Sequence, residues 1–169
     1  MSWILLVFAC VSCGSQKAPP KPTTSIVLAG EMAKLSWYVG DWTCEGTQFA
    51  TQSEPESKWK AEVHVKPDAG GGVVAVHMIG PGDNSTAELK GYDPTSKRWY
   101  HLWTARDGSH GSVSATGWEG ETLVAVDDAD PKHRTVMTKL GADRYSHRDE
   151  ADDGSGFKPV WEKVCDRKR

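Results

Sequence analysis

The sequence predicts an all-β fold, an antiparallel up-and-down barrel of about ten strands that follows a short N-terminal helix. From Asp41 onward, apolar residues recur at every second position, which is the period of a strand with one buried face. Clusters of Gly, Pro, Asp and Asn interrupt this pattern at the roughly 8–12-residue spacing that is typical of sandwiches and barrels. No helical run of ordinary length separates the predicted strands, so parallel α/β folds are excluded. A chain of 169 residues is long enough for one domain with its own core.

The short helix is predicted from the spacing of Met32, Leu35 and Trp37, which places all three on one side of one or two helical turns. Gly40 ends this segment, because glycine is the residue that most often terminates a helix. The period then changes from near 3.6 to two. We therefore expect the first strand at Asp41–Gln48.

Nine further strands are predicted between turn-forming segments such as Pro94-Thr-Ser-Lys97 and Asp107-Gly108. They cover Ser57–Lys66, Val73–Ile79, Ala87–Tyr92, Arg98–Ala105, Gly111–Trp118, Thr122–Val126, Arg134–Leu140, Arg144–Glu150 and Lys158–Cys165. In a closed barrel the first strand pairs with the last one. Trp42 should then be largely buried near one end of the barrel.

The N-terminus is typical of a secretory signal. Residues 3–11 are apolar but too few to span a bilayer as a helix, which needs about 20 residues. The segment Val11-Ser12-Cys13 resembles a bacterial lipoprotein box, in which Cys13 becomes lipidated. Processing at Cys10 and an ordinary cleaved signal with incidental cysteines are the alternatives.

These features divide the chain into three parts. Residues 1–13 are the predicted signal peptide, residues 14–30 a disordered tether rich in Pro, Ser and Lys, and residues 31–169 the barrel domain. The expected location is the bacterial cell envelope, where the lipid anchors the barrel to a membrane on its periplasmic or outer side. The net charge of −3 and the pI near 6.1 give no basic field, so no nucleic-acid partner is expected.

Several blocks of the chain, taken in order, resemble a family of bacterial envelope proteins of unknown function whose members are predicted lipocalin-like (calycin) barrels. The blocks are SWYVGDWTCEG (36–46), GYDPTSKRWY (91–100), DGSHGSVSATGWEG (107–120), Tyr145-Ser-His147 and a Trp161…Cys165 ending. The Gly40-Asp41-Trp42 element is also similar to that of lipocalins and of haem-binding nitrobindin-like barrels. The resemblance implies the fold, and it supplies no reaction and no catalytic residues.

One set of strands predicts a ligand cavity. Pairing Tyr92 with Trp99 across the Pro94 turn makes one face apolar, and this face collects Leu89, Gly91, Tyr100, Leu102, Val113 and Ala115. The other face collects Glu88, Lys90, Trp99, His101, Trp103, Ser112, Ser114 and Thr116. From it we take Trp99, His101, Trp103, Ser112 and Ser114 as candidate ligand-binding residues in a polar-aromatic cavity. The alternative is a solvent-facing surface, because a one-residue slip in register exchanges the two faces.

Tyr145 and His147 on the penultimate strand complete the candidate site. They share a face with Val136, Thr138 and Leu140 if Leu140 pairs with Tyr145. The resemblance to nitrobindin-like barrels implies that a buried His147 could ligate haem iron. Such a histidine is more often hydrogen-bonded to a neighbour or to water, and no cofactor is predicted.

A metal site is not predicted. His64 and His77 lie opposite each other on two strands and could hold zinc together with a third ligand. His64, however, shares its face with Lys60, Glu62 and Lys66, so we expect it to point to water.

The sequence carries no Gly-x-Ser-x-Gly elbow, phosphate-cradling loop or dinucleotide fingerprint, so no enzyme and no catalytic residue is predicted. The leading hypothesis is a non-catalytic, lipid-anchored envelope barrel that binds a small molecule, apolar ligands included. A structural or interaction protein with a filled barrel interior is the alternative, and a haem-binding barrel is a more distant one. A cavity of a few hundred Å³ distinguishes the first two.

The remaining cysteines predict a disulfide between Cys44 and Cys165. If Cys13 is lipidated, cleavage removes Cys10 and leaves only these two thiols, which an oxidising envelope favours pairing. Their Cα atoms must come within about 7 Å, and barrel closure brings the first and last strands that close. Two unrelated buried cysteines are the alternative.

Overall fold

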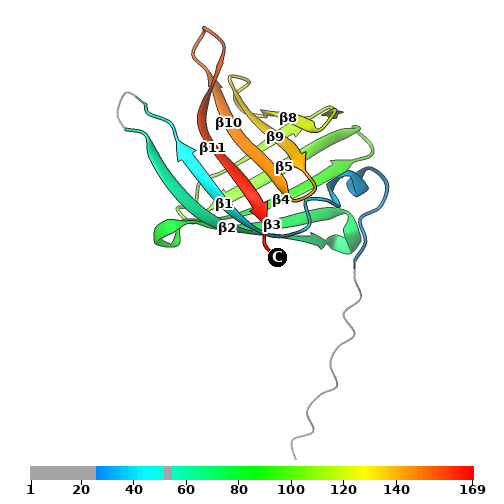
Figure 1. Ribbon diagram of the computed structural model, residues 1–169. Helices are drawn as coiled ribbons and strands as arrows, with labels where there is room; N and C mark the ends of the chain where they lie inside the picture. Colours follow the sequence, from blue (N-terminus) through cyan, green and yellow to red (C-terminus); the bar gives the residue numbers. More distant parts are fainter. Residues whose placement is uncertain (1–25, 52–54) are drawn as a thin grey trace, which may run out of the picture.

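The computed structural model describes residues 26–51 and 55–169 (Figure 1). The predictions for the signal peptide, for Cys10 and Cys13 and for most of the tether therefore fall outside the described residues. Within the described ranges, none of the helices is long and apolar enough to cross a membrane.

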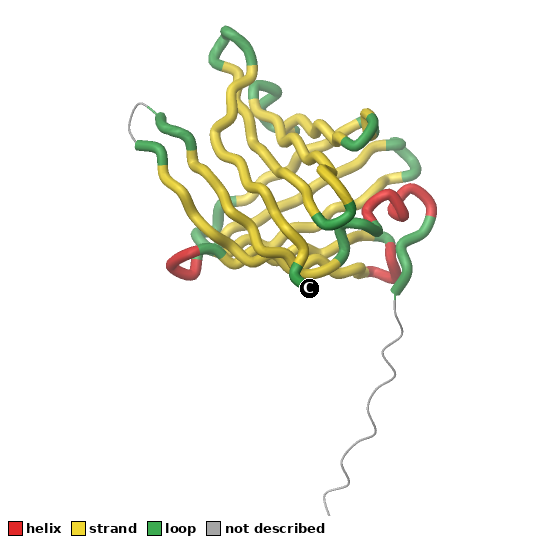
Figure 2. Tube along the Cα trace, in the orientation of Figure 1, coloured by secondary structure: helices red, strands yellow, loops and turns green. Residues whose placement is uncertain are grey.

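The described residues form one antiparallel sheet that closes on itself as a barrel (Figures 1 and 2). Its strands are β1 (Gly40–Gln48), β2 (Ser57–Asp68), β3 (Val73–Ile79), β4 (Ser85–Asp93), β5 (Arg98–Ala105), β6 (His110–Ala115), β7 (Trp118–Glu119), β8 (Thr122–Asp127), β9 (His133–Gly141), β10 (Arg144–Asp152) and β11 (Phe157–Arg167). The strand order runs from β6 down to β1 and then from β11 down to β7, and pairing of β6 with β8 closes the circle. The two-residue β7 pairs with β8 alone, so ten strands make the barrel wall in the described chain. The predicted fold class is confirmed.

Three short 3-10 helices accompany the strands of the described chain: η1 (Gly30–Leu35), η2 (Ala69–Gly71) and η3 (Pro81–Asp83). The predicted N-terminal helix is η1, which ends two residues earlier than Trp37. The predicted strand Gly111–Trp118 is interrupted, since β6 stops at Ala115 and Trp118 belongs to β7.

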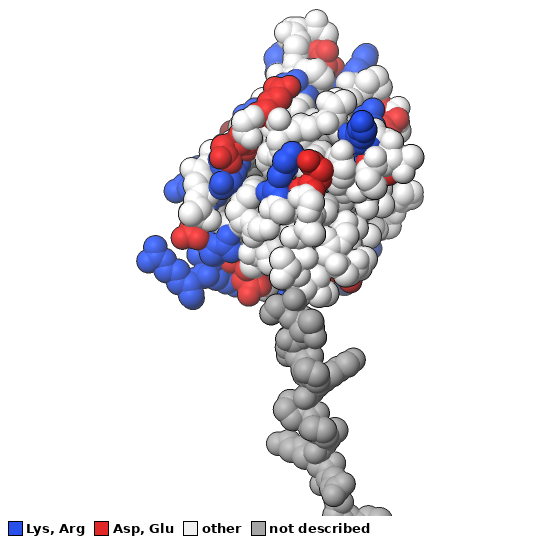
Figure 3. Space-filling view, turned by 90° about the vertical axis from the view of Figure 1, so that its right-hand side faces the viewer, with Lys and Arg blue, Asp and Glu red and all other residues white. Residues whose placement is uncertain are grey.

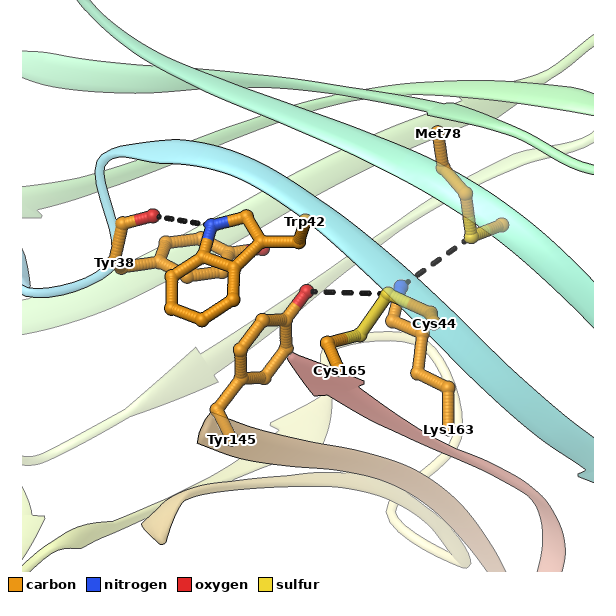
Figure 4. Close-up of a disulfide and its surroundings, with 7 residues drawn as sticks. All are labelled: Tyr38, Trp42, Cys44, Met78, Tyr145, Lys163 and Cys165. Carbon is orange, nitrogen blue, oxygen red and sulfur yellow. Dashed lines mark hydrogen bonds between the residues drawn. A yellow bond between two sulfur atoms is a disulfide. The ribbon is translucent and has the colours of Figure 1, made fainter. Parts of the chain in front are cut away.

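The seam between the first and last strands is built as predicted. Residues Trp42 to Gln48 of β1 pair with residues Trp161 to Arg167 of β11. Cys44 lies directly opposite Cys165, with their Cα atoms 4.0 Å apart, and the two form the predicted disulfide (Figure 4). Both cysteines are fully buried. The disulfide thus joins the two strands at which the linear chain closes into a barrel.

Aromatic side chains fill the end of the barrel beside η1. Trp42 and Tyr38 are 0% exposed, and both rings pack edge-on or tilted against Tyr145 (Figure 4). Leu35 of η1 is also buried here, so this short helix covers one end of the barrel. Leu28, which the sequence assigned to the tether, is 6% exposed and belongs to the same core. The packed part of the chain therefore begins before the predicted boundary at residue 31.

The outer surface carries charges of both signs. On the face that Figure 3 shows, Lys and Arg side chains alternate with Asp and Glu along one edge, side chains of opposite charge lie together near the centre, and the area below them is largely uncharged. Exposed ion pairs such as Lys60–Glu45 and Lys168–Glu62 belong to this mixed pattern, which fits the net charge of −3.

Candidate functional site

The barrel holds a cavity of about 410 Å³, which lies at the end where β1 ends and β2 begins, away from η1. This volume falls within the range of about 300–1,000 Å³ that is typical of small-molecule sites. Residues from eight strands and the η3 loop line it: Gln48, Ser57, Trp59, Met78, Gly80, Pro81, Asn84, Thr86, Glu88, His101, Trp103, Thr135, His147, Asp149 and Trp161.

Three tryptophans form the apolar walls of the cavity. Trp59 and Trp161 come from β2 and β11 and meet edge-to-face, with ring centroids 6.2 Å apart. Trp59 lies opposite Gly46, and a methyl group at Gly46 would overlap its indole ring. Trp103 lies in the same way over Gly111, where an added methyl group would come within 2.9 Å of the ring. Each ring thus occupies the space that a side chain at the opposite glycine would take.

A buried ion pair lies at the floor of the cavity. Oε2 of Glu88 is 2.9 Å from Nζ of Lys90 and 3.0 Å from Nε2 of His101. Burial alone would raise the pKa of Glu88, but the nearby Lys90 and His101 lower it well below its ordinary value. Burial lowers the pKa of His101 as well, and the Lys90 charge adds to this effect. The floor thus presents an ionised carboxylate, held by an ammonium, beside a neutral imidazole at neutral pH.

His147 is the second imidazole of the cavity. Its ring lies 6.0 Å from that of His101 and 5.2 Å from that of Trp161. Both ring nitrogens are buried, and neither has a hydrogen-bond partner among the described residues. Burial lowers the pKa of His147 well below its ordinary value, and the Lys163 charge adds to this effect. A neutral His147 therefore offers one donor and one acceptor that no described residue satisfies, which is rare for buried polar atoms.

Asp149 lies at the mouth of the cavity beside His147. Its Oδ1 accepts a 2.7 Å hydrogen bond from Oγ1 of Thr135 and is 3.9 Å from Nε2 of His147. Burial raises the pKa of Asp149, and the hydrogen bond from Thr135 opposes that rise. The interior thus changes along the barrel axis from an aromatic end, through a charged layer, to a tryptophan-walled cavity.

The structure brings together three of the seven residues that the sequence selected for binding, since His101, Trp103 and His147 line the cavity. Trp99 and Tyr145 also point into the barrel but lie deeper. Trp99 is 3% exposed and packs on Tyr92 and Trp118, and Tyr145 belongs to the aromatic end. A binding role for these residues stays a prediction.

Ser112 and Ser114 lie on the outer face, so placing them on the face of Trp99 was wrong. The predicted pairing of Tyr92 with Trp99 is correct, but Trp99 pairs in turn with Ala115. Val113 and Ala115 therefore face inward, and Oγ of Ser114 instead bonds Arg98 and Asp128 on the surface. The pairing of β5 with β6 differs by one residue from the expected register, so the β6 side chains expected inside the barrel lie outside it and the reverse.

A similar slip affects the strand before Tyr145. Tyr145 pairs with Lys139, not with Leu140, because the register of β9 and β10 shifts between Arg144 and Tyr145. Met137 and Thr135 consequently share the inner face with His147, while Leu140 is 52% exposed. A bulge of this kind adds one residue to a strand and leaves no clear trace in the hydrophobic pattern.

Several cavity residues were not selected from the sequence although their pattern was available. Trp59 continues the alternation of Ala61, Val63 and Val65, and Trp161 lies at an even spacing from Cys165. Glu88 was placed on the correct face but was not proposed for the site. Asp149 and Thr135 carried no signal, because their position depends on the bulge in β9 and on barrel closure.

Among residues 26–51 and 55–169, no group of three or more His, Cys, Asp or Glu side chains is placed to hold a metal ion. His64 and His77 are paired across β2 and β3 as predicted. Nδ1 of His64 lies 2.7 Å from Oδ1 of Asp41, and this hydrogen bond lowers the pKa of the Asp41 carboxyl.

Comparisons with known proteins support the fold alone. No family model matches the chain, and no curated protein matches it in sequence. Among solved structures it is similar to the crystal structure of Rv2717c from M. tuberculosis, with a TM-score of 0.64 and 14% sequence identity. That match covers 84% of this chain and 99% of the other. The chain therefore shares the barrel architecture of a distant structural neighbour.

Proposed function

We propose that this protein is a non-catalytic binding protein whose barrel cavity takes up a small molecule with a flat, largely apolar body. The observation that carries the proposal is the cavity of about 410 Å³ with three tryptophan walls and the unpartnered nitrogens of His147 at its floor. Apolar walls with a few fixed polar groups are typical of small-molecule sites. The cavity also favours a binding protein over the alternative of a filled barrel interior.

Binding is tested by filling the cavity from one strand. Thr86 of β4 lines the cavity, and its neighbour Ala87 points outward and is exposed. We expect Thr86→Phe to weaken binding of the neutral fluorophore 1-pyrenebutyramide at least tenfold, because the added ring occupies the ligand space. Ala87→Phe is the matched control and should bind as the wild type does. Equal binding by both variants, or no binding by the wild type, would contradict the proposal. Native mass spectrometry of protein from its own host would then identify the natural ligand.

A haem-binding barrel is the second candidate, and the observation that favours it is again His147. A neutral imidazole with a nitrogen that no described residue partners, in a cavity with tryptophan walls, could ligate haem iron. The residues present thus fit the group, with His147 as ligand and the tryptophans around the ring. Bound haem would supply redox-active iron that can bind small diatomic ligands. An absorption spectrum of the protein after addition of haemin distinguishes the candidates. If His147 ligates the iron, the Soret band should shift in the wild type and should not shift in His147→Phe.

We further propose that the barrel is held in the bacterial envelope by lipid on Cys13. The buried Cys44–Cys165 disulfide supports an oxidising compartment, since such bonds are rare in the cytosol. The apolar run that ends at Cys13 supports the anchor.

Cys13→Ser is expected to move the protein from the membrane fraction to the soluble fraction, because the lipid attaches through the thiol. Fractionation followed by immunoblotting measures this change. Cys10→Ser is the matched control and should stay with the membrane. Membrane association that survives Cys13→Ser would overturn the proposal.

A further inference from the structure

Lys163 of β11 is a buried ammonium without a carboxylate partner. Its side chain is 1% exposed, and it has no carboxylate oxygen within 4.0 Å among the described residues. Nζ of Lys163 lies 3.4 Å from Sδ of Met78, which is a weak acceptor (Figure 4). It also lies 5.5 Å from the ring centroid of Trp161. An ammonium offers three donors, so most of its hydrogen-bonding capacity is unused.

The other interior lysine differs in this respect. Lys90 is 2.9 Å from Oε2 of Glu88, and the side chains of both are 6% exposed. Glu88 thus already balances one of the two buried lysine charges, and the neutral His101 and His147 add none. Asp149 lies on the mouth side of His147, and Glu88 and Asp149 both attract the Lys163 ammonium from beyond ion-pair distance. Among the described residues, the interior therefore contains one lysine charge that no carboxylate pairs with directly.

Lys163 lies directly behind the cavity floor. It is paired across β10 and β11 with His147, and it contacts Met78 and Trp161, and all three of these residues line the cavity. Met78 is unbranched and flexible, so a small shift of its thioether would open the ammonium to the cavity. His147 stands beside this path with an unpartnered N–H.

We propose that the cavity ligand carries a single acidic group, a carboxylate on a short arm, which pairs with Lys163 and accepts a hydrogen bond from His147 while its flat body lies between the tryptophans. This inference rests on the proposed binding function and names the class of ligand. A buried charge is strongly unfavourable until an opposite charge pairs with it, so an anion at this position gains more than a neutral ligand of the same shape. Burial lowers the pKa of Lys163, and the more distant Glu88 and Asp149 oppose this shift only in part, as expected for an ammonium without a direct ion pair.

The first test compares the two lysines in the free protein. Lys163→Met keeps the length of the side chain and removes an unpaired charge, so we expect the Tm to rise by about 3 °C or more. Lys90→Met is the matched control, and it should lower the Tm because it leaves the Glu88 carboxylate without its partner. A fall in Tm for Lys163→Met comparable to that for Lys90→Met would show that Lys163 is already paired, and would overturn the inference.

The second test uses two probes that differ only in charge, 1-pyrenebutyrate and its isosteric amide, with fluorescence titration as the measurement. We expect the wild type to bind the carboxylate at least tenfold more tightly than the amide. Lys163→Met should abolish this difference and leave binding of the amide unchanged. Lys60→Met, which removes an exposed lysine of β2, should preserve the difference.

The outcomes separate this inference from the proposed function. Equal affinity of the wild type for both probes, or a preference that survives in Lys163→Met, would overturn the acidic-ligand inference and leave the binding function intact. No binding of either probe would overturn both. Loss of the preference together with a raised Tm would support the inference from two independent directions.

Discussion

Trp42→Ala is expected to lower the free energy of unfolding by about 3–5 kcal/mol, the range for large-to-small substitutions in a core. The indole is 0% exposed, and its Nε1 donates a 2.9 Å hydrogen bond to the carbonyl oxygen of Tyr38. The ring packs edge-on against Tyr145, with centroids 4.9 Å apart. Alanine would leave a cavity at the end of the barrel where β1, β10 and η1 meet.

The substitution also removes a stacking surface from Arg167 at the end of β11. The guanidinium lies 4.2 Å from the ring centroid of Trp42, and its nitrogens donate to the carbonyl oxygens of Val39 and Trp37. Arg167 thereby ties the last strand to the segment that leads into the first. Its cation–π contact is worth about 0.5–2 kcal/mol when partly desolvated, so the loss should lie in the upper part of the range.

Urea denaturation of a short series measures these contributions. Trp42→Phe keeps a ring against Tyr145 and Arg167 but loses the indole hydrogen bond, so we expect a smaller loss, about 1–2 kcal/mol. Trp103→Ala is the control for tryptophan removal as such, because Trp103 lies at the cavity wall and is partly exposed. It should lose less than half as much as Trp42→Ala. Near-wild-type stability of Trp42→Ala would contradict the role of Trp42 in closing the barrel end.

The fold could be predicted from the sequence because its determinants are local. Strand positions follow from alternation and from turn residues, and both survive small errors at the ends of strands. The pairing of Tyr92 with Trp99 is an example, since the turn at Pro94–Lys97 fixes it. The seam between β1 and β11 followed from one topological argument, that a barrel without free edges must join its ends.

The candidate site was harder to predict because a shift of one residue in the pairing of two strands moves each side chain to the other face of the sheet. One residue of difference in the β5–β6 turn placed Ser112 and Ser114 outside, and one bulge in β9 changed the partner of Tyr145. Neither shift changes the composition of the strands, so hydrophobicity alone does not reveal it. The charge at Lys163 is a further case, because its lack of a partner is a property of the closed barrel and not of β11.

Removal of the disulfide is the other change for which we expect a large effect. The bond joins residues separated by 121 positions, and loop-entropy arithmetic gives an upper value of nearly 5 kcal/mol for a loop of that length. We expect the variant Cys44→Ala/Cys165→Ala to lose about 3–5 kcal/mol, chiefly because its unfolded chain is no longer constrained. The bond connects the first and last strands of the chain, so refolding of the variant should also slow, since β1 and β11 must meet without a covalent link.

Two measurements distinguish this effect from a change in packing. In urea denaturation, reductant should lower the free energy of unfolding of the wild type by the amount that the variant has lost. Reductant should leave the free energy of unfolding of the variant unchanged. Non-reducing peptide mapping of the wild type should recover the two cysteines in one linked peptide. A loss below about 1 kcal/mol in the variant would mean that the β1–β11 ladder and the aromatic contacts of Tyr145 close the barrel without help from the bond. Refolding that slows without a loss of stability would contradict the entropic account, because a constraint on the unfolded chain acts on both quantities together.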